Sequence, residues 1–306
     1  MQYDDKTIKI LLKSARYKGE YFLNILSILL TLVINYLLIY ASYNLRTNPL
    51  IADAISDYTG ISHDFIEYLS IFNSFAIIIL FLSIIVAICF YNTSYRLKAG
   101  FKNFSIDVMP NKESYYLYKK YCNLLGIKMP TLFLNSNVYD SSIFGVKIRG
   151  TKAIGISTKA YQDIIRRNDY HAFNYQVTTT LGSIYLGHYD LWFQLLTFWA
   201  RIIPLYNKMY SRALSYSTDR VAQIFMGTSP LIISIARETS GMDFFSDEMI
   251  DELLNPEDFK MTRFEKTVAF LYDWISEYPL AYFRLEKILD NDEKDKEFIN
   301  KELSKK

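Results

Sequence analysis

Hydroxyl side chains crowd one short stretch of this sequence, residues 178–183. The members are Thr178, Thr179, Thr180 and Ser183. Such a stretch could supply a nucleophile, which requires a neighbouring base and a site that binds the oxyanion. The nearest bases in the sequence are His171 and His188, and no Gly-x-Ser-x-Gly motif surrounds the stretch. Hydroxyls on a helix can instead bond to carbonyls one turn back, so an atypical hydrolase and a structural role both remain open here.

Metal-ligating side chains are scarce, because the 306 residues include three histidines and two cysteines. A metal site would therefore draw largely on carboxylates, and a disulfide framework is not expected. His171 and His188 would lie about 25 Å apart on one continuous helix, too far to share an ion, and His63 is far away in the sequence. Cys89 lies in an apolar run and Cys122 in a predicted helix, so both are expected to be buried thiols.

The composition excludes two broad classes of protein. Apolar residues make up 51% of the chain and charged residues 22%, which excludes a disordered chain and predicts a large buried or lipid-facing surface. The 34 basic and 32 acidic residues give a net charge of only +2. We therefore expect no nucleic-acid partner, since that function usually needs a strongly basic surface.

Two uncharged runs, residues 21–45 and 68–95, are long enough to cross a membrane. A helix needs about 20 apolar residues to cross the hydrocarbon layer. The runs predict transmembrane helices at about 21–43 and 69–93. A cleavable signal peptide is the competing interpretation of the first run, but its apolar part is long for that role and a second run follows.

The charges that flank the two runs predict the topology. The loop at residues 44–67 carries one basic and four acidic residues, whereas the flanks are basic. The flanking bases are Lys6, Lys9, Lys13, Arg16 and Lys18 before the first run, and Arg96, Lys98 and Lys102 after the second. Because basic flanks stay inside, we expect residues 1–20 and the C-terminal part in the cytoplasm and the loop outside, in a bacterial-type inner membrane.

The rest of the chain, residues 102–290, reads as one cytoplasmic domain that is mainly α-helical with a small β-sheet. The expected strands are 131–135, 143–148 and 153–157, and the expected helices are 111–125, 158–165, 170–188, 210–226, 230–238, 256–276 and 279–289. Residues 291–306 alternate acids and lysines, which predicts a solvated helix or a frayed end.

Residues 191–205 form a strongly apolar segment that is too short to span a membrane and contains Arg201 and Pro204. The alternatives are a buried core helix and an element that lies on or dips into the membrane surface. Trp192 and Trp199 favour the membrane surface, because tryptophan prefers the headgroup region.

Two stretches of the sequence stand out within this order of elements: Leu-Gly-Ser-Ile-Tyr-Leu-Gly-His at 181–188 and Tyr-Ser-Arg-Ala-Leu-Ser-Tyr-Ser-Thr-Asp-Arg-Val-Ala at 210–222. Together with the order of elements, they resemble the HtpX-like and CAAX prenyl-protease-like membrane zinc metallopeptidases. The resemblance covers nearly the whole chain, most clearly residues 130–222. It implies a zincin-like α+β fold. In that family two histidines at i and i+4 and a later glutamate hold zinc, and a glutamate beside the first histidine is the general base.

The resemblance places the three zinc-ligand positions at Thr179, Ser183 and Ser215, and the general-base position at Thr180. Neutral hydroxyls are poor zinc ligands, and a threonine cannot accept a proton from water near neutral pH. The resemblance therefore implies a degenerate member without zinc or another cofactor.

Several residues near these four positions match the pattern of the family. Asp219 occupies the position that in active relatives orients a zinc-binding histidine. Here it is expected to bond to another helix or to pair with an arginine such as Arg212 or Arg220. Arg284 resembles the downstream arginine of the family. His188 is expected to be a capping or interfacial side chain.

A possible peptide-binding edge strand is the last feature that the resemblance implies. It comprises Ser142, Ile143, Phe144 and Gly145.

The leading hypothesis is thus a membrane-anchored pseudopeptidase, without hydrolytic activity, that binds a peptide or protein at the inner membrane face. Its expected partners are membrane lipid and a protein, such as a membrane protease or the substrates of one. The alternatives are a hydrolase with a serine or threonine nucleophile or non-standard metal ligands, and a purely structural membrane protein.

Overall fold

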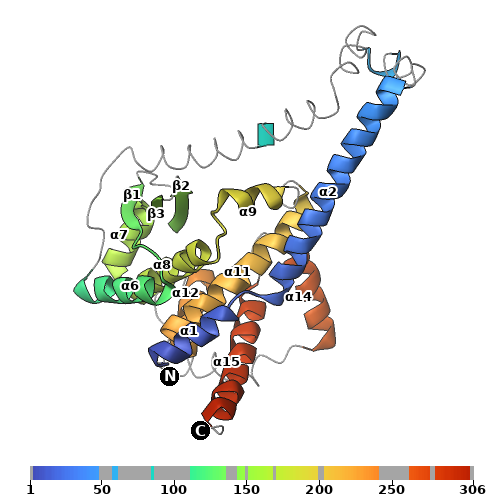
Figure 1. The fold of residues 1–306 in the computed structure, drawn as a ribbon. Coiled ribbons are helices and arrows are strands. Elements are labelled where there is room, and N and C mark those ends of the chain that lie inside the picture. The colour runs from blue at the N-terminus through green and yellow to red at the C-terminus, as the bar shows by residue number, and fades with distance from the viewer. Residues whose placement is uncertain are drawn as a thin grey trace.

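The computed structural model describes residues 3–47, 57–60, 84–85, 111–135, 143–148, 151–167, 170–198, 203–240, 262–275 and 280–303. This part of the chain is mostly helical with one small sheet, as the sequence predicted (Figure 1). The predicted second membrane span lies almost wholly outside the described residues, as does most of the predicted external loop.

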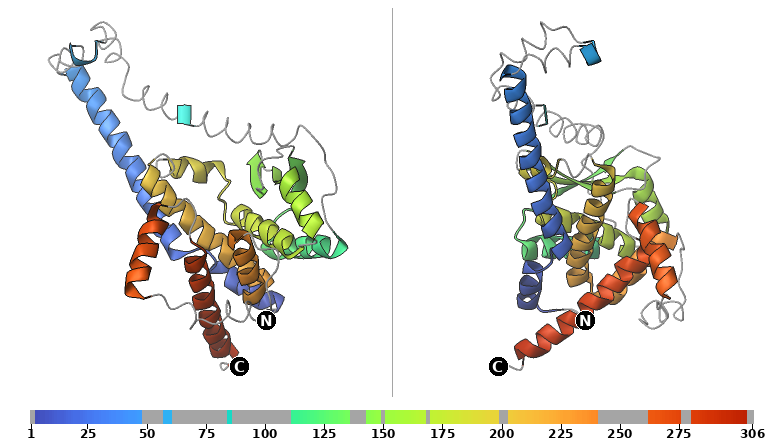
Figure 2. Two further views of the ribbon diagram at one scale, coloured as in Figure 1. Left: turned by 180° about the vertical axis from the view of Figure 1, so that it is seen from behind. Right: turned by 90° about the vertical axis from the view of Figure 1, so that its right-hand side faces the viewer.

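The N-terminal helices differ in what they contact. Helix α1 (Asp5–Lys13) is capped by Asp4, whose carboxylate accepts from the Thr7 amide, and its apolar face is buried in the domain core. Helix α2 (Lys18–Thr47) extends away from the domain (Figures 1 and 2) and exposes apolar side chains along its length. These include Tyr21, Phe22, Ile25, Leu29, Leu32, Val33, Tyr36, Leu37 and Tyr40.

Among the described residues, the stretch Asp5–Ile34 alone is long and apolar enough to cross a membrane. A membrane span and a signal sequence near the N-terminus both have this property. Large contiguous apolar patches, such as the one that α2 exposes, are rare on the water-facing surfaces of soluble proteins.

The sheet has three strands in the order β1-β3-β2. Strands β1 (Thr131–Asn135) and β2 (Ile143–Ile148) have the predicted bounds, and β3 (Thr151–Ser157) begins two residues earlier than predicted. Strand β1 is parallel to β3, and β2 is antiparallel to it with Gly145 opposite Ile154. Within the described residues β2 is therefore an outer strand.

The remaining helices mostly match the predicted pattern. Helix α6 begins after the Asn111 cap and ends at Gly126, whose φ of 64° is the left-handed conformation that favours glycine. The bounds of the helices are α6 Lys112–Leu125, α7 Thr158–Arg167, α8 Tyr170–Tyr185, α9 Leu191–Leu196, α11 Pro204–Met226, α12 Thr228–Ser240, α14 Arg263–Ile275 and α15 Ala281–Leu303.

The segment 191–205 is not one element. It contains α9 and the start of α11, where Pro204 occupies a first-turn position that needs no amide hydrogen. Trp192 is 76% exposed, whereas Thr197 is buried. Trp199 lies outside the described residues. The start of α11 packs on α2, with the Tyr210 hydroxyl 2.9 Å from Asn24 Oδ1.

The last helix continues well beyond the predicted domain end at residue 290. Asp295, in the predicted charged tail, is buried and forms an ion pair with Arg220 of α11. Tyr3, near the other end of the chain, donates to Asp295 over 3.5 Å. The tail is thus a helix that packs on the domain through Asp295, whereas residues 293, 294, 296 and 297 are exposed.

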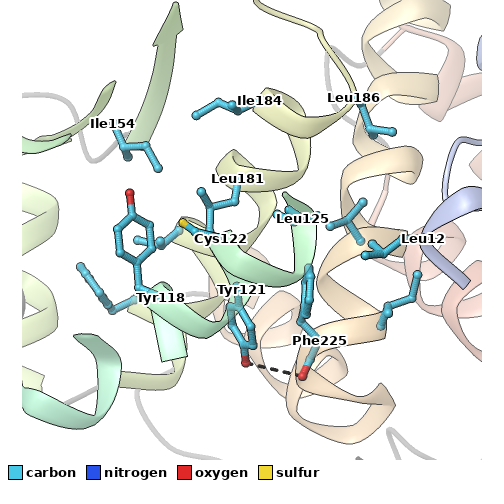
Figure 3. Packing of buried hydrophobic residues seen from close by; sticks show 14 of the residues in the cluster. Leu12, Tyr118, Tyr121, Cys122, Leu125, Ile154, Leu181, Ile184, Leu186 and Phe225 are labelled. Carbon is cyan, nitrogen blue, oxygen red and sulfur yellow. Dashed lines mark hydrogen bonds between the residues drawn. The ribbon is translucent and has the colours of Figure 1, made fainter. Parts of the chain in front are cut away.

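The main core lies between α6, α8, α11, α1 and the sheet (Figure 3). Ile154 and Leu181 are fully buried in it, and Tyr121 lies against Phe225, with ring centroids 4.5 Å apart. Tyr118 donates to the carbonyl of Pro130 over 2.7 Å, which fixes the entry to β1 on α6.

Stability is expected to fall as the pH rises above about 9. Burial raises the pKa of the Cys122 thiol from 9.0 to about 12, and that of Tyr121 from 10.0 to about 12. The unfolded chain therefore releases these protons at a lower pH than the folded protein does. The stabilising contribution of the two buried groups is complete below pH 9 and declines toward pH 12. Unfolding midpoints measured from pH 7 to 10.5 would check this. The Cys122→Ala variant should show a shallower decline, and an equal slope in both proteins would contradict the prediction.

Candidate functional site

The resemblance expects zinc ligands and a general base at Thr179, Thr180, Ser183 and Ser215, and these four are called the degenerate positions below in that sense only. They lie on helices α8 and α11, which approach each other closely at Gly182. A Cβ atom at Gly182 would lie 3.1 Å from Val221 Cβ and 3.5 Å from the carbonyl oxygen of Thr218. The glycine thus allows the backbones of two helices to come close. Thr179 and Ser183 flank this contact on α8, and the segment that includes Ser215 and Asp219 runs along α11.

A prediction arises at this contact. Alanine in place of glycine usually stabilises a helix by about 1 kcal/mol, but here the new methyl group would lie closer to Val221 Cβ than ordinary van der Waals contact. Val221 Cβ is attached directly to the backbone of α11, so relief of this contact requires the two helices to move apart. We expect Gly182→Ala to destabilise the protein by about 1–3 kcal/mol through overpacking. Thermal unfolding in detergent would measure it. Val221→Ala removes the Cγ1 atom that the methyl group would also meet, so the double variant should lose less than the sum of the two single losses. A raised midpoint in the single Gly182→Ala variant would contradict the close packing.

The hydroxyls at three of the degenerate positions bond to their own helices. Thr179 Oγ1 donates to the carbonyl of Gln176 over 2.9 Å, and Thr180 Oγ1 donates to the same carbonyl over 2.8 Å. Ser215 Oγ donates to the carbonyl of Ser211 over 3.1 Å. The back-bonding that the sequence allows is thus present at Thr179 and Thr180, and Ser215 shows the same kind of bond.

Asp219 is buried in an ion pair with Arg284 of α15. Arg284 Nε donates to Oδ2 over 2.8 Å and its Nη2 donates to Oδ1 over 2.9 Å, so the contact is bidentate. Arg284 also donates to the Tyr175 hydroxyl of α8. The expectation of an arginine partner is thus confirmed, but the arginine is neither Arg212 nor Arg220.

The two expected arginines are both buried on α11. Arg220 pairs with Asp295, and its Nη1 donates to Gln223 Oε1 over 3.0 Å. Gln223 in turn donates to the carbonyl of Ile288 over 2.7 Å. Two separate sets of polar contacts, one at Asp219 and one at Arg220, therefore join α11 to α15.

The residues at the degenerate positions do not fit a zinc ion. Threonine and serine hydroxyls bind zinc poorly, those of Thr179 and Ser215 donate to carbonyls, and Asp219 is neutralised by Arg284. Within the ranges that the structure describes, there is no group of three or more His, Cys, Asp or Glu side chains that could hold a metal.

A second polar cluster, not predicted from the sequence, surrounds Glu20 at the base of α2. Glu20 is completely buried. Its Oε1 lies 3.2 Å from His188 Nε2 and 3.3 Å from an Arg16 nitrogen, and its Oε2 accepts from Ser217 Oγ. The backbone amide of Tyr17 donates to the same serine over 2.9 Å. This cluster joins α2, α11 and the chain after α8.

His188 lies in a turn rather than in the predicted helix 170–188, because α8 ends at Tyr185. Gly187 has a φ of 79°, and the amide of His188 donates to the carbonyl of Ser183 over 3.0 Å. The imidazole stacks on Phe193 of α9, with ring centroids 5.5 Å apart. The His188 side chain is buried between helices, and its polar partner is Glu20.

The expected edge strand is only partly described. Ser142 lies outside the described residues, as does the Phe144 side chain, and Ile143 is half-buried. Gly145 is buried, and its amide donates to the Tyr189 hydroxyl over 3.3 Å. A Cβ atom at Gly145 would lie 3.1 Å from Thr180 Cγ2, so β2 passes directly beside the degenerate general-base position.

A scan against family models, a search of curated proteins and a search of solved structures each gave no match. The contacts described above are therefore the basis for any statement about function.

Proposed function

We propose that this protein is a membrane-anchored pseudopeptidase that binds an extended peptide or a protein segment without hydrolysing it. It has a zincin-like domain behind two membrane spans, with both termini on the cytoplasmic side of an inner membrane. Its protein partner is a membrane protease or the substrates of one, and lipid surrounds α2.

The observation that carries this proposal is the use of the former catalytic positions for structural contacts. The Thr179, Thr180 and Ser215 hydroxyls donate to helix carbonyls, and Asp219 holds α15 through Arg284. A general base needs a free lone pair near water, and a metal ligand needs a side chain directed at the ion. Threonine and serine hydroxyls are too weakly basic to accept a proton from water near neutral pH, and those of Thr179, Thr180 and Ser215 are directed at carbonyls of their own helices.

Two further observations support a retained peptidase-like arrangement. The helices with the degenerate positions pack tightly at Gly182. The outer strand β2 lies beside Thr180, which is where an edge strand must lie to present a peptide to a catalytic helix. Peptide addition to a sheet edge uses main-chain hydrogen bonds and needs no catalytic group.

The alternative of a serine or threonine hydrolase receives less support. Thr178 donates to the carbonyl of Asn174, as the neighbouring threonines do to theirs. Ser217, His188 and Glu20 do gather, but the serine and the histidine contact different oxygens of one carboxylate, and all three are buried. A substrate could not reach Ser217 in this arrangement.

Metal analysis and proteolysis assays on the purified full-length protein in detergent test the proposal. We expect less than stoichiometric zinc and no casein cleavage above background. Stoichiometric zinc together with cleavage that a chelator abolishes would overturn it.

A gain-of-metal variant tests the arrangement separately. Thr179→His, Thr180→Glu, Ser183→His and Ser215→Glu together should create a site that binds one zinc ion per chain, if these positions converge. The matched control retains Thr179→His and Thr180→Glu only and should bind zinc much more weakly. Equal zinc binding by both variants would contradict the zincin-like geometry.

A further inference from the structure

Within the described residues, β2 is an outer strand of the sheet, and the Tyr189 side chain contacts it. The Tyr189 hydroxyl accepts from the Gly145 amide over 3.3 Å, and its ring is so near that a Cβ at Gly145 would lie 2.5 Å from Tyr189 Cε2. An amide that β2 would offer to an added strand is thus already bonded.

Tyr189 belongs to the turn at residues 186–190, whose backbone is well fixed. Gly187 adopts a positive φ, the Asp190 amide donates to the Gly187 carbonyl over 2.9 Å, and the Leu186 amide donates to the carbonyl of Gly182 over 2.9 Å. A displacement of this turn would therefore also displace the Cα atom from which the Tyr189 ring extends.

The same turn is attached to the base of α2. His188 contacts the buried carboxylate of Glu20, and Arg16 donates to the carbonyl of Leu186. Two adjacent residues of the turn thus contact different elements. His188 contacts the beginning of α2, and Tyr189 contacts the outer strand β2.

We propose that Tyr189 is an internal cap on the outer edge of β2 and that the Glu20–His188 contact holds this cap in place. An extended peptide would add to β2 at Gly145 only after the Tyr189 hydroxyl leaves the amide. A shift of α2 relative to the domain would move the turn and release the cap. The peptide part of this inference rests on the proposed function, whereas the capping contact does not.

The Gly145 amide can be observed by itself. The sequence contains 11 glycines, and Gly145 alone follows a phenylalanine. Labelling phenylalanine with ¹³C at the carbonyl and glycine with ¹⁵N therefore leaves a single amide signal in a carbonyl-filtered NMR spectrum. Hydrogen exchange of that signal, in full-length protein in detergent, reports the opening of the capping contact.

Tyr189→Phe retains the ring and removes the acceptor, and we expect the Gly145 amide to exchange about three- to tenfold faster. His188→Ala should accelerate the same amide, although it leaves Tyr189 unchanged. The control Asp295→Asn weakens a buried ion pair on α15 without touching the turn, and it should not change this exchange rate. An unchanged rate in Tyr189→Phe would overturn the cap, and an unchanged rate in His188→Ala would overturn its link to α2.

Peptide binding is tested with a fluorescein-labelled seven-residue peptide of alternating valine and threonine, by fluorescence anisotropy. We expect Tyr189→Ala to bind it at least about tenfold more tightly than the unmodified protein, because the internal competitor is gone. Equal, measurable affinities would overturn the competition. Binding to neither protein, with accelerated exchange in Tyr189→Phe, would support the cap and contradict the proposed peptide-binding function.

Discussion

Replacing Arg284 by methionine is expected to lower the free energy of unfolding by about 3–5 kcal/mol, since it leaves a buried carboxylate without its cation. The side chain of Asp219 is 4% exposed and that of Arg284 is 11% exposed. Water therefore cannot readily replace the hydrogen bonds that the carboxylate loses. The same substitution removes the donor to the Tyr175 hydroxyl and thereby loosens α8, α11 and α15 together. Chemical unfolding in detergent, followed by tryptophan fluorescence, would measure the loss.

Three comparisons separate the ion pair from general disruption. Arg284→Lys keeps the charge but lacks the planar fork that meets both carboxylate oxygens, so an intermediate loss is expected. Asp219→Asn combined with Arg284→Met should be less damaging than Arg284→Met alone. Lys266→Met breaks an ion pair with Glu286 in which both side chains are about half exposed, and it should leave the midpoint nearly unchanged. If Arg284→Met behaved like Lys266→Met, the ion pair would have no structural role.

Replacing Glu20 by alanine is the second change with a large expected effect, also about 3–5 kcal/mol. Glu20 is the common acceptor for Arg16, His188 and Ser217. Its removal takes the carboxylate away from the buried His188 imidazole and leaves Ser217 with its contacts to the Ala213 carbonyl and the Tyr17 amide. Because these groups belong to the turn after α8 and to α11, the domain should also separate more easily from α2. Limited proteolysis near residue 17 and the thermal midpoint would both report it.

Glu20→Gln keeps an acceptor oxygen of the same shape but removes the charge, so a smaller loss is expected. The matched control is Glu113→Ala in the first turn of α6, where the side chain is exposed and the change should be minor. A midpoint for Glu20→Ala equal to that of Glu113→Ala would show that α2 is attached by other contacts.

The sequence was sufficient to predict the bounds of elements that begin or end at a capping residue, a glycine or a proline. Asn111 and Gly126 delimit α6, and Pro130 precedes β1, so these elements lie where the sequence places them. The start of α11 was missed because the apolar run 191–205 suggested a surface segment, although Pro204 is a favoured first-turn residue. The apolar composition of the run favoured the surface interpretation over the helix start that Pro204 indicates.

The contacts of the candidate site could be predicted only where they are local. Back-bonding of Thr179 and Thr180 spans one helical turn and follows from residue type. The pairing of Asp219 with Arg284 and of Glu20 with His188 joins residues that are 65 and 168 positions apart. Such pairings depend on how helices cross, which no local pattern encodes. One signal was present for the second: Glu20 is an isolated acid at the beginning of an uncharged run.

The buried Asp295 on α15 bears on how the topology of this protein can be mapped. Reporter proteins fused to a C-terminal truncation reveal on which side of a membrane that end lies, provided that the truncated chain still folds. A fusion placed after residue 290 would delete Asp295, leave Arg220 without its carboxylate and also remove the partner of Tyr3. A reporter attached beyond Leu303 retains these contacts, so its location would report the folded protein rather than a damaged one.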